Sequence, residues 1–390
     1  MKTKFKFLSA LTVALLLGFS SCSNDDAKDN TDNGEKKSLF FKLDKEAIAK
    51  SEGVAVADGT KATLSSGYLY FVNSGGTIIE RYQLTTDASS DLPNGKISIA
   101  EASAPGVTIS GIPGSVTAAH VFGNVPAVDQ NGATLTMPTS GSINTVKALT
   151  IGIASQVTTA SCNLYGTANL VPAPVAPDYT CDVELNPTIA RIELSDITVT
   201  GDITGFTVDG IFIDNFDKVG SIGGTTGTYS KIENGTDPAK FAVGGAIYPI
   251  SDRGVTFDDN GGTGYNAVSK VAKPAGSNVW GYNLFAASTL DGGSAVPIIV
   301  IRLKNITTTL NSTPGAVFAD PQYITIKGFR PAGGGALLTE ISAGKVYKVS
   351  LTVNAIEPED LAPVPNVDAI NVTVTVNVVA WEAVPLAPEF

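Results

Sequence analysis

The sequence predicts an all-β protein that folds as two β-sandwich domains in tandem. Apolar residues alternate with polar ones along many short segments, which is the period of a strand with one buried face. The 390 residues include 40 glycines and 21 prolines, which suit frequent turns, and few segments have the apolar spacing of a helix. The length is that of two domains, each able to bury its own core.

Residues 1–21 have the features of a lipoprotein signal peptide. Lys2, Lys4 and Lys6 precede an apolar run that is too short to span a bilayer as a permanent helix. The run ends in Phe19-Ser-Ser-Cys22, and small residues before a cysteine suit the signal peptidase that releases an N-terminal Cys. We predict that Cys22 carries acyl chains such as palmitate, which anchor the protein. The alternative is an ordinary cleaved signal with an incidental cysteine.

Residues 22–50 are predicted to be an acidic tether followed by one apolar strand. The tether holds Asp25 and Asp26 and lacks an apolar face, so it does not contribute to a core. The strand at 38–43 is short and apolar. The polar loop behind it carries Lys45, Lys50 and Lys61.

The remaining strand candidates fall into two groups on either side of a junction at 184–187. An N-terminal domain at 51–185 holds the candidates 62–72, 77–84, 96–99, 106–109, 118–122, 133–137 and 148–153. A C-terminal domain at 186–390 holds the candidates 186–194, 205–216, 277–285, 296–303, 323–329, 347–355 and 370–378.

The last strand candidate has a regular apolar face and ends the chain. A connector with three prolines, which lack backbone donors, separates it from the strand at 347–355, so the two are not joined by a tight hairpin. A terminal strand of this kind completes either its own sheet or the sheet of another molecule. Residues 367–390 are therefore a candidate donor strand, with the apolar positions Ile370, Val372, Val374, Val376 and Val378.

Two further cysteines, Cys162 and Cys181, flank a proline-rich segment at 171–177. In an exported protein this spacing favours a disulfide, which would stabilise the fold by about 3 kcal/mol through loop closure. Two separately buried thiols are the alternative.

The sequence carries few groups that could form an active site. Its one histidine, His120, is expected to end or edge a strand, and the two cysteines lack the spacing of a zinc site. The glycine-rich segments lack the lysine of a phosphate-binding loop. We expect no enzyme activity, no catalytic residue, no metal and no cofactor. The net charge of −11 also makes nucleic acid an improbable partner.

Several motifs, in this order, resemble the fimbrillins of the Bacteroidales, and the similarity is greater to the minor-fimbrium type. The motifs are Ala190-Arg-Ile-Glu-Leu194, Gly210-Ile-Phe-Ile-Asp-Asn215, the pair Trp280 and Tyr282, and Gly344-Lys-Val-Tyr-Lys-Val349 followed by the valine-rich strand and Trp381. The resemblance covers the whole precursor. It implies two transthyretin-like sandwich domains with a C-terminal strand extension, export as a surface lipoprotein of the outer membrane, and assembly into a fimbrium that supports adhesion.

The resemblance also implies how the subunits assemble. A surface protease cuts after the first strand, and the C-terminal strand of another subunit fills the groove that the first strand leaves. The family cut follows an arginine, whereas the first arginine here, Arg81, lies within a predicted strand pair. Lys50 and Lys45 are the candidate cleavage sites instead, although both also suit plain solvated charges.

The implied partners are other copies of the chain, accessory fimbrial subunits, the processing protease and host or bacterial surface ligands. The alternative function is a non-polymerising fimbrial anchor, or a surface lipoprotein that binds glycans or proteins.

Overall fold

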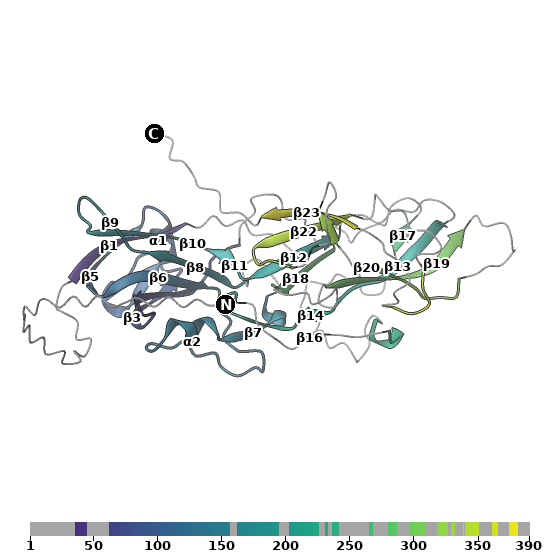
Figure 1. Cartoon of the computed structure of the whole chain (residues 1–390), viewed down its shortest axis with the longest axis horizontal. Helices are drawn as coiled ribbons and strands as arrows, with labels where there is room; N and C mark the ends of the chain where they lie inside the picture. Colours follow the sequence, from purple (N-terminus) through teal and green to yellow (C-terminus); the bar gives the residue numbers. More distant parts are fainter. Residues whose placement is uncertain are drawn as a thin grey trace, which may run out of the picture.

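The computed structural model of the protein describes nearly three fifths of the chain. The described residues are 36–44, 62–156, 162–194, 203–225, 231–232, 236–241, 265–267, 280–286, 297–308, 318–326, 329–331, 338, 340–350, 361–365 and 374–380. Strands before β12 (Ile189–Leu194) lie toward one end of an elongated molecule and most later strands toward the other (Figure 1). We refer to residues up to Pro187 as the N-terminal half and to the later ones as the C-terminal half.

The first strand of the N-terminal half lies inside a four-stranded sheet with the order β5-β1-β10-β9. It pairs antiparallel with β5 on one side and parallel with β10 on the other. The bounds are β1 (Lys36–Asp44), β5 (Val107–Pro113), β9 (Val171–Pro172) and β10 (Tyr179–Glu184).

A six-stranded sheet with the order β11-β8-β6-β2-β3-β4 forms the second layer of this half. Its hairpin of β2 and β3 turns at Asn73, whose side chain accepts hydrogen bonds from the backbone of Gly75 and Thr77. The bounds are β2 (Gly67–Asn73), β3 (Ile78–Thr85), β4 (Lys96–Ser98), β6 (Val116–Gly123), β8 (Leu164–Asn169) and β11 (Asn186–Pro187).

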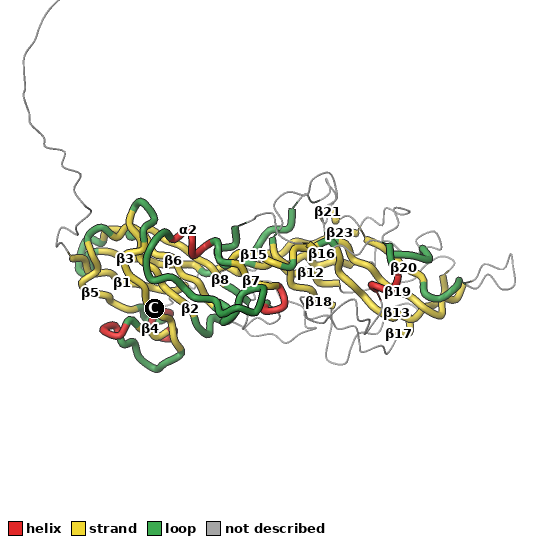
Figure 2. Tube along the Cα trace, turned by 90° about the horizontal axis from the view of Figure 1, so that it is seen from below, coloured by secondary structure: helices red, strands yellow, loops and turns green. Residues whose placement is uncertain are grey.

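The two layers bury a common apolar core, because each strand presents every second side chain to the other sheet. Short helices lie at the margins of the sheets (Figure 2). Ser98 caps the helix at Ile99–Ser103 by accepting a hydrogen bond from the backbone N–H of Glu101. The helical segments are η1 (Leu92–Asn94), α1 (Ile99–Ser103), α2 (Ile143–Lys147) and η2 (Ile153–Ser155), with η3 (Pro238–Phe241) in the C-terminal half.

The C-terminal half has a five-stranded sheet, β18-β12-β22-β23-β21, and a four-stranded sheet, β17-β13-β19-β20. The bounds in the first are β12 (Ile189–Leu194), β18 (Trp280–Phe285), β21 (Phe329–Pro331), β22 (Lys345–Ser350) and β23 (Val374–Ala380). Those in the second are β13 (Ile203–Asp214), β17 (Tyr265–Ala267), β19 (Ile298–Thr308) and β20 (Gln322–Ile326). The short strands β14 (Phe216–Asp217) and β16 (Lys231–Ile232) pair with each other.

A backbone ladder joins the two halves. Strand β7 (Thr150–Gly152) of the N-terminal half pairs antiparallel with β15 (Val219–Ser221) of the C-terminal half. The backbone of Ile222 continues this contact by donating to Leu149 O.

The all-β sandwich class that the sequence predicts is confirmed. Several strand limits are wrong. The predicted strand at 133–137 is part of a loop, because the Asp129 carboxylate accepts hydrogen bonds from the backbone of Asn131 and Ala133 and turns the chain there. The candidate at 96–99 ends one residue early because Ser98 begins a helix. Strands β8, β9 and β10, around the proline-rich segment, were not predicted.

Candidate functional site

The candidate functional site is the groove that holds β1, which we call the first-strand groove. Along β1, Leu39, Phe41 and Leu43 are at most 1% exposed, as the alternation in the sequence predicts. Phe40 and Lys42 point to the other face and are only partly buried. The strand thus contributes three large side chains to the core.

The walls of the first-strand groove come from residues more than 60 positions further along the chain. Phe41 lies opposite Val107 of β5 and Cys181 of β10, while Leu43 lies opposite Val183. All of these side chains are less than 9% exposed. If β1 left, an apolar slot bounded by two unpaired strand edges would therefore remain.

The start of β1 is held by polar contacts at the end of the groove. The Lys37 ammonium donates to Val116 O at 3.0 Å and lies 4.6 Å from the centre of the Tyr179 ring. The backbone N–H of Ser38 donates to Asp178 Oδ2 at 3.0 Å. These contacts fix where the strand begins, next to a shift in its register between Lys37 and Ser38.

The last described strand, β23, has the same arrangement of neighbours as β1. It lies between β22, to which it is antiparallel, and β21, to which it is parallel. Val376 stands opposite Val349 of β22, Val378 opposite Tyr347, and Val374 opposite Phe329 of β21. In this structure the candidate donor strand therefore completes the sheet of its own chain. Ile370 and Val372 lie outside the described residues.

The candidate processing and lipidation residues Cys22, Lys45 and Lys50 also lie outside the described part of the chain. Arg81 lies in β3, as the sequence predicts, and pairs with Tyr70 of β2. Its guanidinium donates to Met137 O at 2.7 Å and covers the Tyr68 ring. An arginine held in a strand in this way does not offer a protease an extended loop.

The two other cysteines are free and buried, so the predicted disulfide is not formed in this structure. Cys181 Sγ lies 3.8 Å from Ala168 O, whereas Cys162 lies just before the start of β8. Six residues of extended chain separate Ala168 from Cys162, which is roughly 20 Å and beyond the reach of a disulfide. Burial raises the pKa of Cys181 to about 12 and that of Cys162 further, so neither is a thiolate at neutral pH.

His120 lies in the middle of β6, which pairs with β2 on one side and β8 on the other, so the expectation that it ends or edges a strand is wrong. The interior position is tolerated because its Nδ1 is 2.8 Å from the Tyr165 hydroxyl. Burial, and then the nearby Lys147 ammonium, lower the pKa of His120 to about 4. A neutral histidine that stacks on a tyrosine is a packing residue here.

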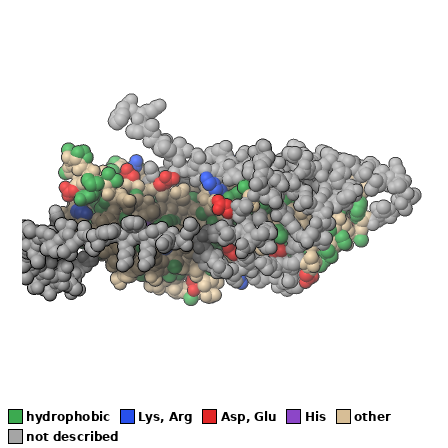
Figure 3. Space-filling view, viewed as in Figure 1, with side chains coloured by type: hydrophobic (Ala, Val, Ile, Leu, Met, Phe, Trp, Pro, Cys, Tyr) green, Lys and Arg blue, Asp and Glu red, His purple; other side chains and the backbone are tan. Residues whose placement is uncertain are grey.

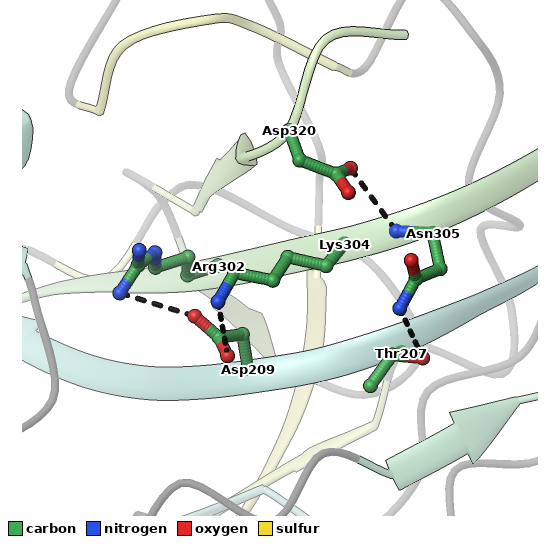
Figure 4. Close-up of polar contacts among 6 residues, drawn as sticks. All are labelled: Thr207, Asp209, Arg302, Lys304, Asn305 and Asp320. Atoms are coloured by element: carbon green, nitrogen blue, oxygen red, sulfur yellow. Dashed lines mark hydrogen bonds and ion pairs between the residues drawn. The ribbon is translucent and has the colours of Figure 1, made fainter. Parts of the chain in front are cut away.

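The main charged cluster among the described residues joins β13 to β19 (Figure 4). Asp209 accepts from the Arg302 guanidinium at 3.1 Å and from the Lys304 ammonium at 2.9 Å. Beside it, the backbone N–H of Asn305 donates to Asp320 Oδ1 at 3.0 Å. The cluster ties neighbouring strands together and offers no acid and base pair aimed at a common point.

The described residues hold no group of three or more His, Cys, Asp or Glu side chains that could bind a metal ion. In the same part of the chain, no helix is long and apolar enough to cross a membrane.

Comparison with solved structures shows the fold to which the chain is similar. It matches a putative cell adhesion protein from Parabacteroides distasonis with a TM-score of 0.51 and 14% sequence identity, over 89% of this chain and 100% of that one. A fimbrilin from Porphyromonas gingivalis matches with a TM-score of 0.49 and 14% identity, over 90% and 99%. A putative cell adhesion protein from Bacteroides eggerthii matches with a TM-score of 0.49 and 17% identity, over 89% and 97%.

No protein-family model and no curated protein sequence matches the chain. The match to the protein from Parabacteroides distasonis shows that the chain shares the fold of a putative cell adhesion protein.

Proposed function

We propose that the protein is a structural subunit of a bacterial surface fimbria that supports adhesion and polymerises by strand donation. It would be exported as a lipoprotein through Cys22 and would lose its first strand to a protease. The last strand of one copy would then enter the first-strand groove of the next. The fold similarity to a putative cell adhesion protein supports this proposal.

The observation that carries the proposal is the position of β1. It is a central strand of its sheet, yet only the residues between Asp44 and Ala62 join it to the rest of the described fold. One cut in that segment, which includes Lys45 and Lys50, therefore separates β1 from the subunit.

The energetics of the groove favour refilling after such a cut. Burying Leu39, Phe41 and Leu43 contributes a gross stabilisation of about 5–9 kcal/mol, at about 1.5–3 kcal/mol for each side chain. This is comparable to the whole stability of a typical domain, about 5–15 kcal/mol. A subunit with an empty groove is thus poorly stable, and a strand from another copy restores both the apolar contacts and the backbone ladder.

The length of the chain allows the last strand to reach another copy. Residues 351–373 lie between β22 and β23, and a fully extended chain covers about 3.3–3.6 Å per residue. The backbone of Ala362 pairs with Tyr323 of β20, so the part that can extend without breaking this bridge is 363–373, which spans roughly 40 Å. Head-to-tail donation does not close on itself, so the product is an open filament.

The test uses the purified precursor and a lysine-specific protease. We expect processed wild type to form a ladder on a denaturing gel without boiling, and the ladder to disappear when residues 367–390 are deleted. Val376→Lys should also abolish it, whereas the matched variant Thr375→Lys, on the alternate position of the same strand, should retain it. Circular dichroism of each unprocessed precursor shows whether the variant folds.

A processed wild type that stays monomeric would contradict the proposal. It would favour the alternative, a non-polymerising fimbrial anchor or a surface lipoprotein that binds glycans or proteins. The place of β23 in its own sheet is the observation that favours this alternative. The N-terminal residue of the protein on intact cells separates the two roles, because an anchor keeps the lipid-modified Cys22 and a shaft subunit begins after Lys45 or Lys50.

A further inference from the structure

An exposed apolar loop lies beside the first-strand groove. We define the apolar tip as residues 171–177, with the sequence Val-Pro-Ala-Pro-Val-Ala-Pro, between the start of β9 and the start of β10. Val171 is 57% and Val175 is 73% exposed, and Val128 at 43% is the other exposed large hydrophobic residue in the described part of the chain. Hydrophobic side chains gather at this end of the molecule (Figure 3).

The apolar tip is a loop with a restricted backbone conformation. The backbone N–H of Ala173 donates to Asp178 O at 2.8 Å and closes its base. Three prolines restrict the backbone of residues 171–177, so little conformational entropy remains to be lost on contact with a partner.

The apolar tip lies at the end of the groove where β1 begins. Asp178, the next residue after the tip, accepts the hydrogen bond from Ser38, and Tyr179 lies under Lys37. Strand β9 lies at the end of the molecule far from β13, β17 and β19 (Figure 1). The tip thus borders the free end of the groove.

The opposite end of the groove leads into the C-terminal half of the same chain. Asp44 stands opposite Glu184, and β12 begins five residues after Glu184. A strand from another copy is therefore expected to enter at the free end, past the tip, and to run in the direction of β1. It would then be antiparallel to β5 and parallel to β10, the arrangement that β23 has with β22 and β21.

We infer that the apolar tip is a docking surface for a second copy of this chain, the copy that donates its last strand. This inference rests on the proposed strand donation. Because the donated strand passes the tip, the surface next to that strand on the donor is brought against it. In the filament, the donor copy then covers Val171 and Val175. This contact orients the donor copy before its last strand has fully paired in the groove.

Assembly kinetics and an environment probe test the docking surface. The double variant V171S/V175S should form ladders roughly tenfold more slowly than wild type, because the contact loses apolar burial. V128S is the matched control, since Val128 is exposed near the middle of the molecule, in the loop where Gln130 contacts Thr150 of β7. It should assemble at the wild-type rate.

In a second measurement, a bimane fluorophore on V175C should shift to shorter wavelength on assembly, while the same fluorophore on V128C should not. Cys162 and Cys181 are buried and do not compete for the label. Suppose that wild type assembles, that V171S/V175S assembles at the same rate, and that the emission of the fluorophore at 175 does not shift. The docking surface is then contradicted, whereas strand donation is not. If processed wild type does not assemble at all, strand donation is wrong and the docking surface with it.

Discussion

The ring of Phe40 lies directly over Gly106, so that a Cβ at position 106 would overlap the ring. Gly106 also has a φ of +118°, a conformation that side chains rarely adopt. We expect Gly106→Ala to destabilise the unprocessed protein by about 2–4 kcal/mol, from backbone strain and from the clash. Urea unfolding measures the change.

Gly132→Ala is the matched control, because Gly132 has a φ of +80° and open space where its Cβ would lie. Gly132→Ala should lower the free energy of unfolding by the backbone strain alone, about 1–2 kcal/mol. In a double-mutant cycle, Phe40→Ala should relieve the excess cost of Gly106→Ala and leave Gly132→Ala unchanged. Additive costs for Phe40 and Gly106 would mean that the ring does not cover the glycine in solution.

His120 should make the stability depend on pH. Its pKa is about 4 in the folded protein, below the ordinary value of about 6.5, because burial and Lys147 oppose the charged form. The unfolded chain binds the proton more readily, so this stabilisation is complete above pH 6.5 and is lost as the pH falls toward 4. We expect a loss of about 1–2 kcal/mol, reduced by partial exposure of the ring.

The measurement is the difference in unfolding free energy between pH 7 and pH 4.5, for wild type and His120→Gln. Carboxylates affect both proteins alike, so the variant should lose less stability than wild type over this interval. Equal losses would show that His120 does not carry the effect.

In the folded protein, Cys162 and Cys181 should be protected from alkylation and should not be joined by a disulfide. Since both thiols are buried and their pKa values are raised, alkylation of the native protein at pH 8 should be slow at both positions. After unfolding without reductant, both should react fully, as read by peptide mass mapping. A linked pair of peptides containing Cys162 and Cys181 would contradict the structure.

The ion pairs of Asp209 should stabilise the C-terminal half. Asp209→Asn leaves Arg302 and Lys304 without their shared carboxylate in a place where the aspartate is 12% exposed, so we expect a loss of about 1–3 kcal/mol. The control is Asp182→Asn on the exposed face of β10, expected within about 0.5 kcal/mol of wild type. Equal effects in thermal unfolding would contradict a stabilising role.

Much of the strand content was predictable because alternation is a local property. The apolar positions of β1 follow from residues 38–43 alone. The strand nature of β23 follows in the same way from the alternation at 370–378. The partners of a strand are not local, since Phe41 meets Cys181 through contacts 140 positions apart in the sequence. The sequence therefore predicted that β1 and β23 are strands, but it left open which sheet each completes.

Strands around the proline-rich segment were missed for a related reason. In β10, the buried Cys181 and Val183 alternate with Thr180 and Asp182, and this alternation is too short to be distinguished from a loop beside three prolines. The polar residues at the junction of the two halves were also missed. Asn163 and Asn283 are isolated in the sequence, and only the fold brings them together.

The last prediction concerns the buried polar network that joins the halves. Asn163 donates through its side chain to Thr188 Oγ1 and to Ile222 O, both at 2.8 Å, and its backbone N–H donates to Gln156 Oε1 at 2.6 Å. Asn283 of β18 donates to Gln156 O at 2.7 Å. All of these side chains are buried, so each lost hydrogen bond leaves a polar group that neither the protein nor water can satisfy.

Asn163→Ala should therefore destabilise the protein by about 2–4 kcal/mol and weaken the link between the halves. Buried side chains of both halves form one continuous cluster, so we expect wild type to unfold in a single calorimetric transition. The variant should show two, because the halves then unfold at different temperatures. Asn169→Ala, on the exposed end of β8, is the control and should keep one transition. Two transitions already in wild type would mean that the network does not couple the unfolding of the two halves.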